Sequence, residues 1–129
     1  MKKQIGSVLF FLAWLILSPA FAFSQIPQQL VAGLKSGDAK VVAAQFNETI
    51  ELVVLDQQLV CPKVQAEQIL ADFFKIHKPM NFAISHQGGN DSSYAIGKMT
   101  TSNGNFRIYF LIKSKEEKPQ IVQLRIDKD

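Results

Sequence analysis

YAIGKMTTSNGNFRIYFLIK, residues 94–113, is the stretch that decides the fold. Apolar and polar side chains alternate on both sides of Asn103-Gly104, which predicts two strands joined by a tight two-residue turn. A type I′ hairpin at this turn sets the register of the two strands. The expected pairs are Ser102 with Asn105, Met99 with Ile108, Gly97 with Phe110 and Ala95 with Ile112.

The two faces of this hairpin are expected to differ. Opposed residues share a face, so small residues meet large ones on one side, as in a packed core, and Val122, Leu124 and Ile126 are expected to join it. The other face is expected to carry Tyr94, Ile96, Lys98, Arg107, Tyr109 and Leu111. Because Tyr and Arg are frequent interface anchors, this face is a candidate interface. The alternative is a half-exposed sheet face with scattered apolar residues.

Strand patterns extend beyond the hairpin. The segments 81–87, 93–101, 105–113 and 120–127 predict four strands joined by short turn-forming connections, and so an antiparallel meander. An earlier segment, 49–55, is rich in β-branched residues and also predicts a strand.

Helical periodicity dominates the region before the meander. Residues 64–77 predict a helix that ends before Pro79, with Ala66, Ile69, Leu70, Phe73, Ile76 and His77 on its apolar side. Shorter helices are expected from Pro27 to Ser36-Gly37 and from an Asp38 cap through Phe46. The order predicts an α+β domain in which N-terminal helices pack on a curved antiparallel sheet, forming a cone that could hold a cavity at its open end.

The first 22 residues have the features of a secretory signal peptide. Lys2 and Lys3 precede an apolar run over residues 5–17, and Ala20-Phe21-Ala22 places small residues at the cleavage spacing. The run is shorter than the ~20 residues of a spanning helix. We therefore expect cleavage, rather than a retained anchor, to leave residues 23–129 as a single domain that does not span a membrane. The expected location is the periplasm or the exterior of the cell.

The net charge limits the class of partner that we expect, and the cysteine content limits the disulfide bonds that the chain can form. Without Lys2 and Lys3, the formal net charge of +3 falls to +1, which gives no electrostatic footprint for nucleic acid. Cys61 is the only cysteine, so an internal disulfide is excluded. An unpaired thiol that packs as a small hydrophobe is expected, and a Cys61-linked dimer is the alternative.

Catalytic groups are few. His77 is expected either at the rim of the cavity or as a helix-end residue that bonds a carbonyl and interacts with the helix dipole. His86 alternates with Phe82 and Ile84, so we expect it on their face, near the open end of the cone, where it could approach His77. Two histidines do not complete a metal site, so neither a metal nor a cofactor is expected.

The carboxylates that acid–base chemistry would need are not expected to point into the interior of the cone. Asp72 falls on the polar side of the long helix, and Glu51 lies opposite Ile50 and Leu52 on its strand. The pair Gly88-Gly89 is too short a signal for a phosphate loop. These observations disfavour an enzyme and identify no catalytic residue.

Four segments carry a resemblance to a known family: KVQAEQILADFF (63–74), HQG (86–88), residues 94–113 quoted above and IVQLRIDK (121–128). They resemble the bacterial family of domains of unknown function numbered 4783, whose members are short exported proteins. The resemblance covers nearly all of residues 23–129 and implies the nuclear-transport-factor-2-like (cystatin-like) cone fold. It implies no activity. One departure is Cys61-Pro62, where a Ser-type cap is expected before the long helix.

Two hypotheses of different classes follow. The first is a non-catalytic binding or assembly module that acts through the outward sheet face, with a second copy (a homodimer) or an envelope protein as partner. The alternative is a small-molecule binder or isomerase-like enzyme that uses His77 and His86 at the mouth of the cone. A filled core favours the first hypothesis, and an internal cavity with convergent polar groups favours the second.

Overall fold

The computed structural model describes residues 26–89, 92–116 and 118–129. The predicted signal peptide lies outside the described residues, and so do Asn90, Asp91 and Glu117 of the predicted turns. The elements are α2 (Gln28–Ser36), α3 (Ala39–Ala43), β1 (Phe46–Val54), β2 (Gln57–Pro62), α4 (Lys63–Ile76), β3 (Pro79–Gly88), β4 (Ser93–Thr101), β5 (Gly104–Lys115) and β6 (Lys118–Lys128). None of the described helices is both long and apolar enough to cross a membrane.

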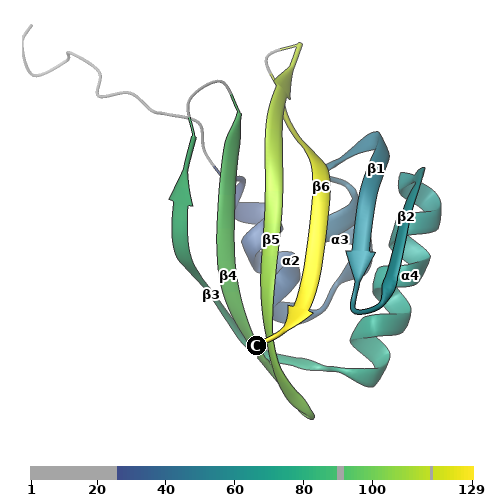
Figure 1. Cartoon of the computed structure of the whole chain (residues 1–129), viewed down its shortest axis with the longest axis vertical. Helices are drawn as coiled ribbons and strands as arrows, with labels where there is room; N and C mark the ends of the chain where they lie inside the picture. The colour runs from purple at the N-terminus through teal and green to yellow at the C-terminus, as the bar shows by residue number, and fades with distance from the viewer. Residues whose placement is uncertain (1–25, 90–91, 117) are drawn as a thin grey trace, which may run out of the picture.

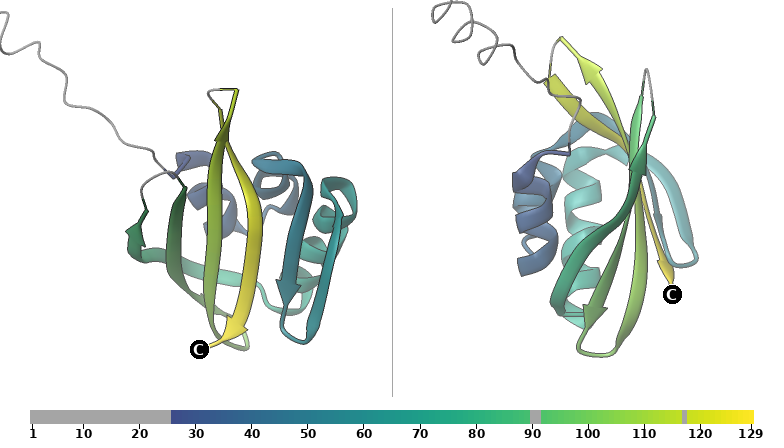
Figure 2. Two further views of the ribbon diagram at one scale, coloured as in Figure 1. Left: turned by 45° about the horizontal axis from the view of Figure 1, so that its top comes forward. Right: turned by 90° about the vertical axis from the view of Figure 1, so that its left-hand side faces the viewer.

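One six-stranded sheet forms the front layer, in the order β2-β1-β6-β5-β4-β3. Neighbouring strands are antiparallel except β1 and β6, which run parallel. The described helices all lie on one face of this curved sheet (Figure 1; Figure 2). The predicted α+β architecture, with N-terminal helices packed on a mostly antiparallel sheet, is therefore confirmed.

Large side chains fill the space between the sheet and the helices. Four phenylalanines, Phe46, Phe82, Phe106 and Phe110, are at most 1% exposed. The helices add Leu30 and Leu34 from α2 and Leu70 from α4, each fully buried. Burial of each such side chain stabilises the fold by roughly 1.5–3 kcal/mol. The interior of the cone is thus a packed core.

Helix α4 packs against β1 and β2, which form one edge of the six-stranded sheet. Pro62 precedes its first turn and provides no side-chain cap, in keeping with the missing Ser-type residue. The buried side chains of α4 are Ala66, Leu70, Phe73 and Phe74. The expectation that Ile76 belongs to the buried stripe was wrong, because Ile76 lies in the last turn of the helix and is 63% exposed.

Two boundaries in the first half of the chain differ from the prediction. The second helix ends at Ala43 instead of continuing through Phe46, because Phe46 is the first residue of β1 and is buried in the core. Strand β2 was not predicted. It pairs with β1 across the Leu55-Asp56 turn, in which Leu55 adopts a positive φ of 56°.

The predicted meander is confirmed, but the register of its central hairpin was wrong by two residues. Thr101 pairs with Gly104, so the turn consists of Ser102-Asn103 and Met99 faces Phe106. The other core pairs are Gly97 with Ile108 and Ala95 with Phe110. Because the shift is even, every side chain keeps its predicted face.

The turn chemistry explains this register. A type I′ turn needs positive φ at both central residues, yet neither Ser102 nor Asn103 has one, and Gly104 carries the positive φ of 135°. Thr101 Oγ1 donates to the Gly104 carbonyl at 2.8 Å and accepts from the Asn103 N–H at 3.2 Å. The Thr101 side chain therefore closes the turn one residue earlier than the Asn-Gly pair suggests.

A second irregularity lies between β5 and β6. The register shifts between Leu111 and Ile112, which pair with Gln123 and Ile121 respectively. Ile121 is fully buried, whereas Val122 is only partly buried. Ile121 therefore takes the core position that was expected for Val122.

Candidate functional site

The strand register arranges the side chains on the helix-free face of the sheet in transverse rows, three of which cross its centre. Opposed residues share a face, so each row can be traced from strand to strand. We call this surface the outer face. The three central rows are Ala83, Lys98, Arg107 and Asp127; then His86, Ile96, Tyr109, Arg125, Val53 and Gln58; and then Gly88, Tyr94, Leu111, Gln123, Glu51 and Val60.

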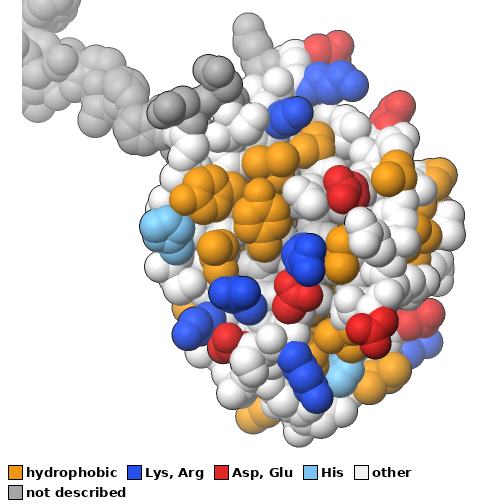
Figure 3. All heavy atoms as spheres, viewed as in Figure 1, with side chains coloured by type: hydrophobic (Ala, Val, Ile, Leu, Met, Phe, Trp, Pro, Cys, Tyr) orange, Lys and Arg blue, Asp and Glu red, His pale blue; other side chains and the backbone are white. Residues whose placement is uncertain are grey.

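An aromatic cluster lies where the second and third rows cross β4 and β5. The rings of Tyr94 and Tyr109 are 6.3 Å apart and nearly parallel, with an interplanar angle of 26°. His86 Nε2 lies 3.0 Å from the Tyr94 hydroxyl. Ile96 and Leu111 flank the rings and, like both tyrosines, remain partly exposed. Figure 3 shows hydrophobic side chains gathered over this part of the sheet, with a histidine at the edge.

Charged side chains surround this cluster. Lys98 Nζ lies 4.0 Å from Asp129 Oδ2, and Arg125 Nε lies 2.7 Å from Asp127 Oδ2. Arg107 and Glu51 form no ion pair with any other residue that the structure describes. Exposed ion pairs contribute little stability, about 0–1 kcal/mol, so these charges add little to the stability of the fold.

The position of His86 corrects a prediction. Ile84 pairs with Gly97, but His86 pairs with Ile96, so the register shifts and Ser85 is the extra residue. The Ser85 hydroxyl donates to the Ile96 carbonyl at 3.1 Å. A bulge of this kind reverses the alternation of the strand. His86 therefore lies on the outer face with Tyr94, away from the face that buries Phe82.

His77 lies on the helix side of the sheet and is the C-cap of α4. Its ring packs 4.6 Å from the Phe73 ring and 4.7 Å from the Phe106 ring. Its Nδ1 lies 2.5 Å from Asn103 Oδ1. The two histidines therefore lie on opposite faces of the sheet, so His77 does not approach His86.

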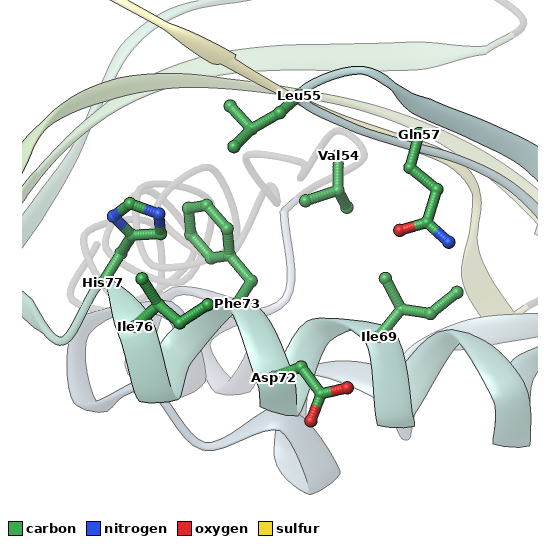
Figure 4. Close-up of a pocket in the computed structure, with 8 residues that line it drawn as sticks. All are labelled: Val54, Leu55, Gln57, Ile69, Asp72, Phe73, Ile76 and His77. Carbon is green, nitrogen blue, oxygen red and sulfur yellow. The ribbon is translucent and has the colours of Figure 1, made fainter.

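A groove of about 280 Å³ opens between the end of α4 and the β1–β2 turn. Its wall is mostly apolar, with polar groups only at the edges. The lining residues are Val54, Leu55, Gln57, Ile69, Asp72, Phe73, Ile76 and His77. In Figure 4 the Asp72 carboxylate points away from the space between the helix and the hairpin. The groove thus has an imidazole and an amide at its edges, but no inward carboxylate to act with them as an acid–base pair.

The remaining reactive groups are scattered. Cys61 is a free, buried thiol, and burial raises its pKa above the usual range. Within residues 26–89, 92–116 and 118–129, no three side chains of His, Cys, Asp or Glu gather as metal ligands would. Sequence reasoning had placed the six hairpin residues of the outer face correctly, but it had placed His86 on the opposite face. It also missed Glu51 as a member of the outer face's charge pattern.

Comparison with known proteins places the chain among solved structures. Two crystal structures of DUF4783 proteins match it closely. One, from Bacteroides fragilis, is 36% identical, covers 81% of this chain and 100% of its own, and has a TM-score of 0.78. The other, from Bacteroides ovatus, is 30% identical, covers 83% of this chain and 98% of its own, and also has a TM-score of 0.78.

A more distant match supports the fold. An NTF2-like protein of unknown function from Shewanella baltica is 14% identical and covers 77% of this chain and 84% of its own, with a TM-score of 0.59. No curated protein sequence matches the chain.

The family model for the domain of unknown function DUF4783 matches residues 27–127, which include every helix and nearly all of every strand described above. The chain belongs to the DUF4783 family of domains and has the NTF2-like fold.

Proposed function

We propose that this protein is an exported, non-catalytic binding or assembly module that acts through its outer face. One observation carries the proposal: Tyr94, Tyr109 and His86 form a partly exposed cluster on a sheet face that no described helix covers. Aromatic side chains at the centre of a surface patch are typical anchors of protein interfaces. A contiguous exposed apolar patch on a small domain is also typical of a contact site.

The filled interior of the cone supports a binding role over a catalytic one. The cone is filled by fully buried side chains such as Phe82, Phe106 and Phe110. The groove beside α4 contains no inward carboxylate, and the imidazole of His77 is engaged with Asn103. The groups that general acid–base chemistry needs do not converge there.

Site-specific photo-cross-linking tests the proposal. The photoreactive residue p-benzoylphenylalanine replaces Tyr109 in one variant and Lys75, an exposed residue of α4, in the other. After irradiation of the producing cells, we expect a discrete adduct from position 109 and none from position 75. The mass of the adduct identifies the partner. Equal labelling at both positions, or none at position 109, would contradict the proposal.

Export is a separate part of the proposal and rests on residues 1–22. N-terminal sequencing of the protein from the cell envelope or the medium should begin at Phe23 or within a few residues of it. A protein that begins at Met1 would exclude cleavage.

The groove gives a second candidate function, the binding of a small apolar molecule. Two observations favour it: Ile76 is 63% exposed at its edge, and Leu55 is held beside it in a left-handed conformation with φ of 56°. Strained residues often cluster at ligand sites. Binding of an apolar fluorescent dye that Ile76→Asp weakens and Lys75→Asp does not would support this function, and equal weakening by both would exclude it.

A further inference from the structure

We infer that the free edge of β2 binds an extended peptide as an additional antiparallel strand, with one apolar side chain of the peptide in the groove beside α4. This site lies at the edge of the sheet, apart from the outer face on which the proposed function rests. The peptide that fits it has a large apolar residue and, two residues later, a basic one. Three features combine here: an unpaired strand edge, an apolar groove that adjoins it and two carboxylates beside the groove.

The backbone of β2 has hydrogen-bonding groups that point away from the sheet. Among the described strands, β2 pairs only with β1. The Leu55 N–H donates to a carbonyl of β6 at 2.9 Å, so Val54, the preceding residue of β1, directs its backbone groups to β2. Because Val54 faces Gln57, the backbone groups of Gln57 point to β1, and those of Gln58 and Val60 point outward.

This edge lacks the features that usually protect an exposed strand, which are charged side chains, a bulge or an internal proline. β3, at the other end of the sheet, has the bulge at Ser85. In contrast, β2 pairs with β1 without a register shift, its sequence QQLVCP has no charged residue, and its proline, Pro62, comes last. Val60 is 68% exposed beside the outward backbone groups. The edge of β2 is therefore open to another strand.

Gln57 joins this edge to the groove, because it is the first residue of β2 and also lines the groove. In Figure 1, α4 lies behind β2 along the same margin of the sheet, and Figure 4 shows the Gln57 side chain extending from the hairpin towards Ile69 of the helix. Opposed residues of neighbouring strands share a face, so the peptide residue that pairs with Gln57 points to the helix side. An apolar side chain there reaches the groove of about 280 Å³, and its burial favours binding.

Two carboxylates determine the charge of the peptide. Asp56 lies in the turn directly before Gln57, and Asp72 lines the groove from α4. Both are exposed, and neither forms an ion pair within the part of the chain that the structure describes. An antiparallel peptide runs past Gln57 towards this turn, so a basic residue two positions after the apolar one lies on the same face, beside the carboxylates. The opposite charges then set the register and direction of the peptide.

A separate peptide suits this site better than the β2 strand of a second copy does. The apolar helix-side residues of β2 are Leu59 and Cys61. Cys61 is 3% exposed, and Leu59 packs against the core of its own chain. Neither side chain is therefore free to enter the groove of another copy.

Fluorescence anisotropy with a labelled synthetic peptide tests the pairing. In this probe threonine alternates with valine, phenylalanine and lysine, in that order, so that phenylalanine pairs with Gln57. We expect saturable binding, and binding weaker by about tenfold or more for a scrambled peptide of the same composition. N-methylation of the threonine amides, which face β2, should weaken binding to a similar extent because it removes hydrogen bonds of the ladder. N-methylation of the phenylalanine amide, which faces away, is the matched control.

Substitutions in the protein test the same contacts. Val60→Pro removes the outward N–H and no hydrogen bond to β1, so it should weaken binding of the probe by about tenfold or more. Val60→Thr keeps this N–H and should bind the probe like the wild type. Asp72→Lys should weaken binding by about threefold. Glu67→Lys, beside the α2–α3 connection on another side of α4, is its control and should have no effect. Circular dichroism checks that each variant is folded.

The outcomes distinguish the peptide site from the functions proposed above. Equal binding of the probe and its scrambled control, or no binding of either, overturns the inference. Equal affinity of the two N-methylated probes also overturns it, even if Val60→Pro does not fold. A wild type that sediments as a dimer, and as a monomer after Val60→Pro, overturns the peptide in favour of a second copy. Loss of peptide binding in Val60→Pro with unchanged binding of the apolar dye supports the edge as the site, and the cross-link from position 109 tests the outer face independently.

Discussion

His86 Nε2 lies 3.0 Å from the hydroxyl of Tyr94, across the edge of the sheet from β3 to β4. This contact exists because the bulge at Ser85 turns His86 to the outer face. It links the edge strand to the pair of tyrosines that carries the proposed function. Its contribution to folding and its contribution to binding can be separated by mutation.

Tyr94→Phe removes the hydroxyl and keeps the ring. Because His86 is exposed and water can replace the lost hydroxyl, we expect the free energy of unfolding to fall by no more than about 0.5–1 kcal/mol. Urea denaturation followed by circular dichroism measures this change. A loss of several kcal/mol would show that the contact supports the core, in disagreement with its position on the surface.

Gly97→Ala should be strongly destabilising. A methyl group at this position would lie 2.3 Å from Phe82 Cζ and 3.0 Å from the Ala83 carbonyl oxygen. Phe82 is fully buried, so it cannot move aside freely, and overpacking of this kind costs about 1–3 kcal/mol.

Shortening Phe82 gives the control for the Gly97 prediction. In the double variant Gly97→Ala/Phe82→Leu, the smaller side chain leaves room for the new methyl group. A double-mutant cycle in urea should give a favourable coupling of about 0.5–3 kcal/mol. Additive losses would mean that the close approach of Gly97 to Phe82 is not the source of the destabilisation.

The His77 ring should couple the end of α4 to the β4–β5 turn. His77 packs between Phe73 and Phe106 and lies within hydrogen-bond distance of Asn103 Oδ1. We expect His77→Ala to lower the free energy of unfolding by about 1–2 kcal/mol and Asn103→Ala by about 0.5–1.5 kcal/mol. The double variant should lose less than the sum, and strict additivity would exclude the contact as a stabilising one.

Cys61 should make stability fall at alkaline pH. Burial raises the pKa of the thiol in the folded protein, so the folded state holds this proton more tightly than the unfolded state. The contribution to stability is therefore complete below the unfolded pKa of about 8.5 and is lost as pH rises through the higher folded value. Urea titrations from neutral to alkaline pH should show this decline in the wild type.

The variant Cys61→Ala isolates the thiol from the other groups that titrate at alkaline pH. It removes the ionisable group from both states, so its stability should decline less steeply over the same pH range. Identical slopes for the two proteins would exclude the thiol as the cause.

The alternation of residues 94–113 predicted the two sheet faces correctly, even though the register was wrong. A shift of two residues changes every pair and preserves every face, so Arg107 and Tyr109 remained outward and Phe106 and Phe110 remained inward. The face to which a side chain points can be predicted reliably, because successive residues of a strand alternate between the two faces of the sheet. Register was less predictable because it depended on the hydrogen bonds of one hydroxyl, that of Thr101.

Other features of the structure could not be predicted from the residues that form them, because they depend on the pairing of strands. Strand β2 is a short edge strand of sequence QQLVCP that acquires its structure from pairing with β1. The face of His86 depended on a single extra residue in β3, which the spacing of Phe82 and Ile84 does not reveal. The charge pattern formed by Arg107 and Glu51 joins residues of distant strands, so it becomes visible only when the strand order is known.

The parallel pairing of β1 with β6 ties the folding of this sheet to the synthesis of β6, the last strand that the structure describes. Strand β6 lies between β1 and β5, so the first strand in the chain has no neighbour on that side until residues 118–128 have been made. Contacts between such distant segments slow folding, because a long loop must close before they form. Until residues 118–128 are available, β1 and β2 cannot join the part of the sheet that β3, β4 and β5 form.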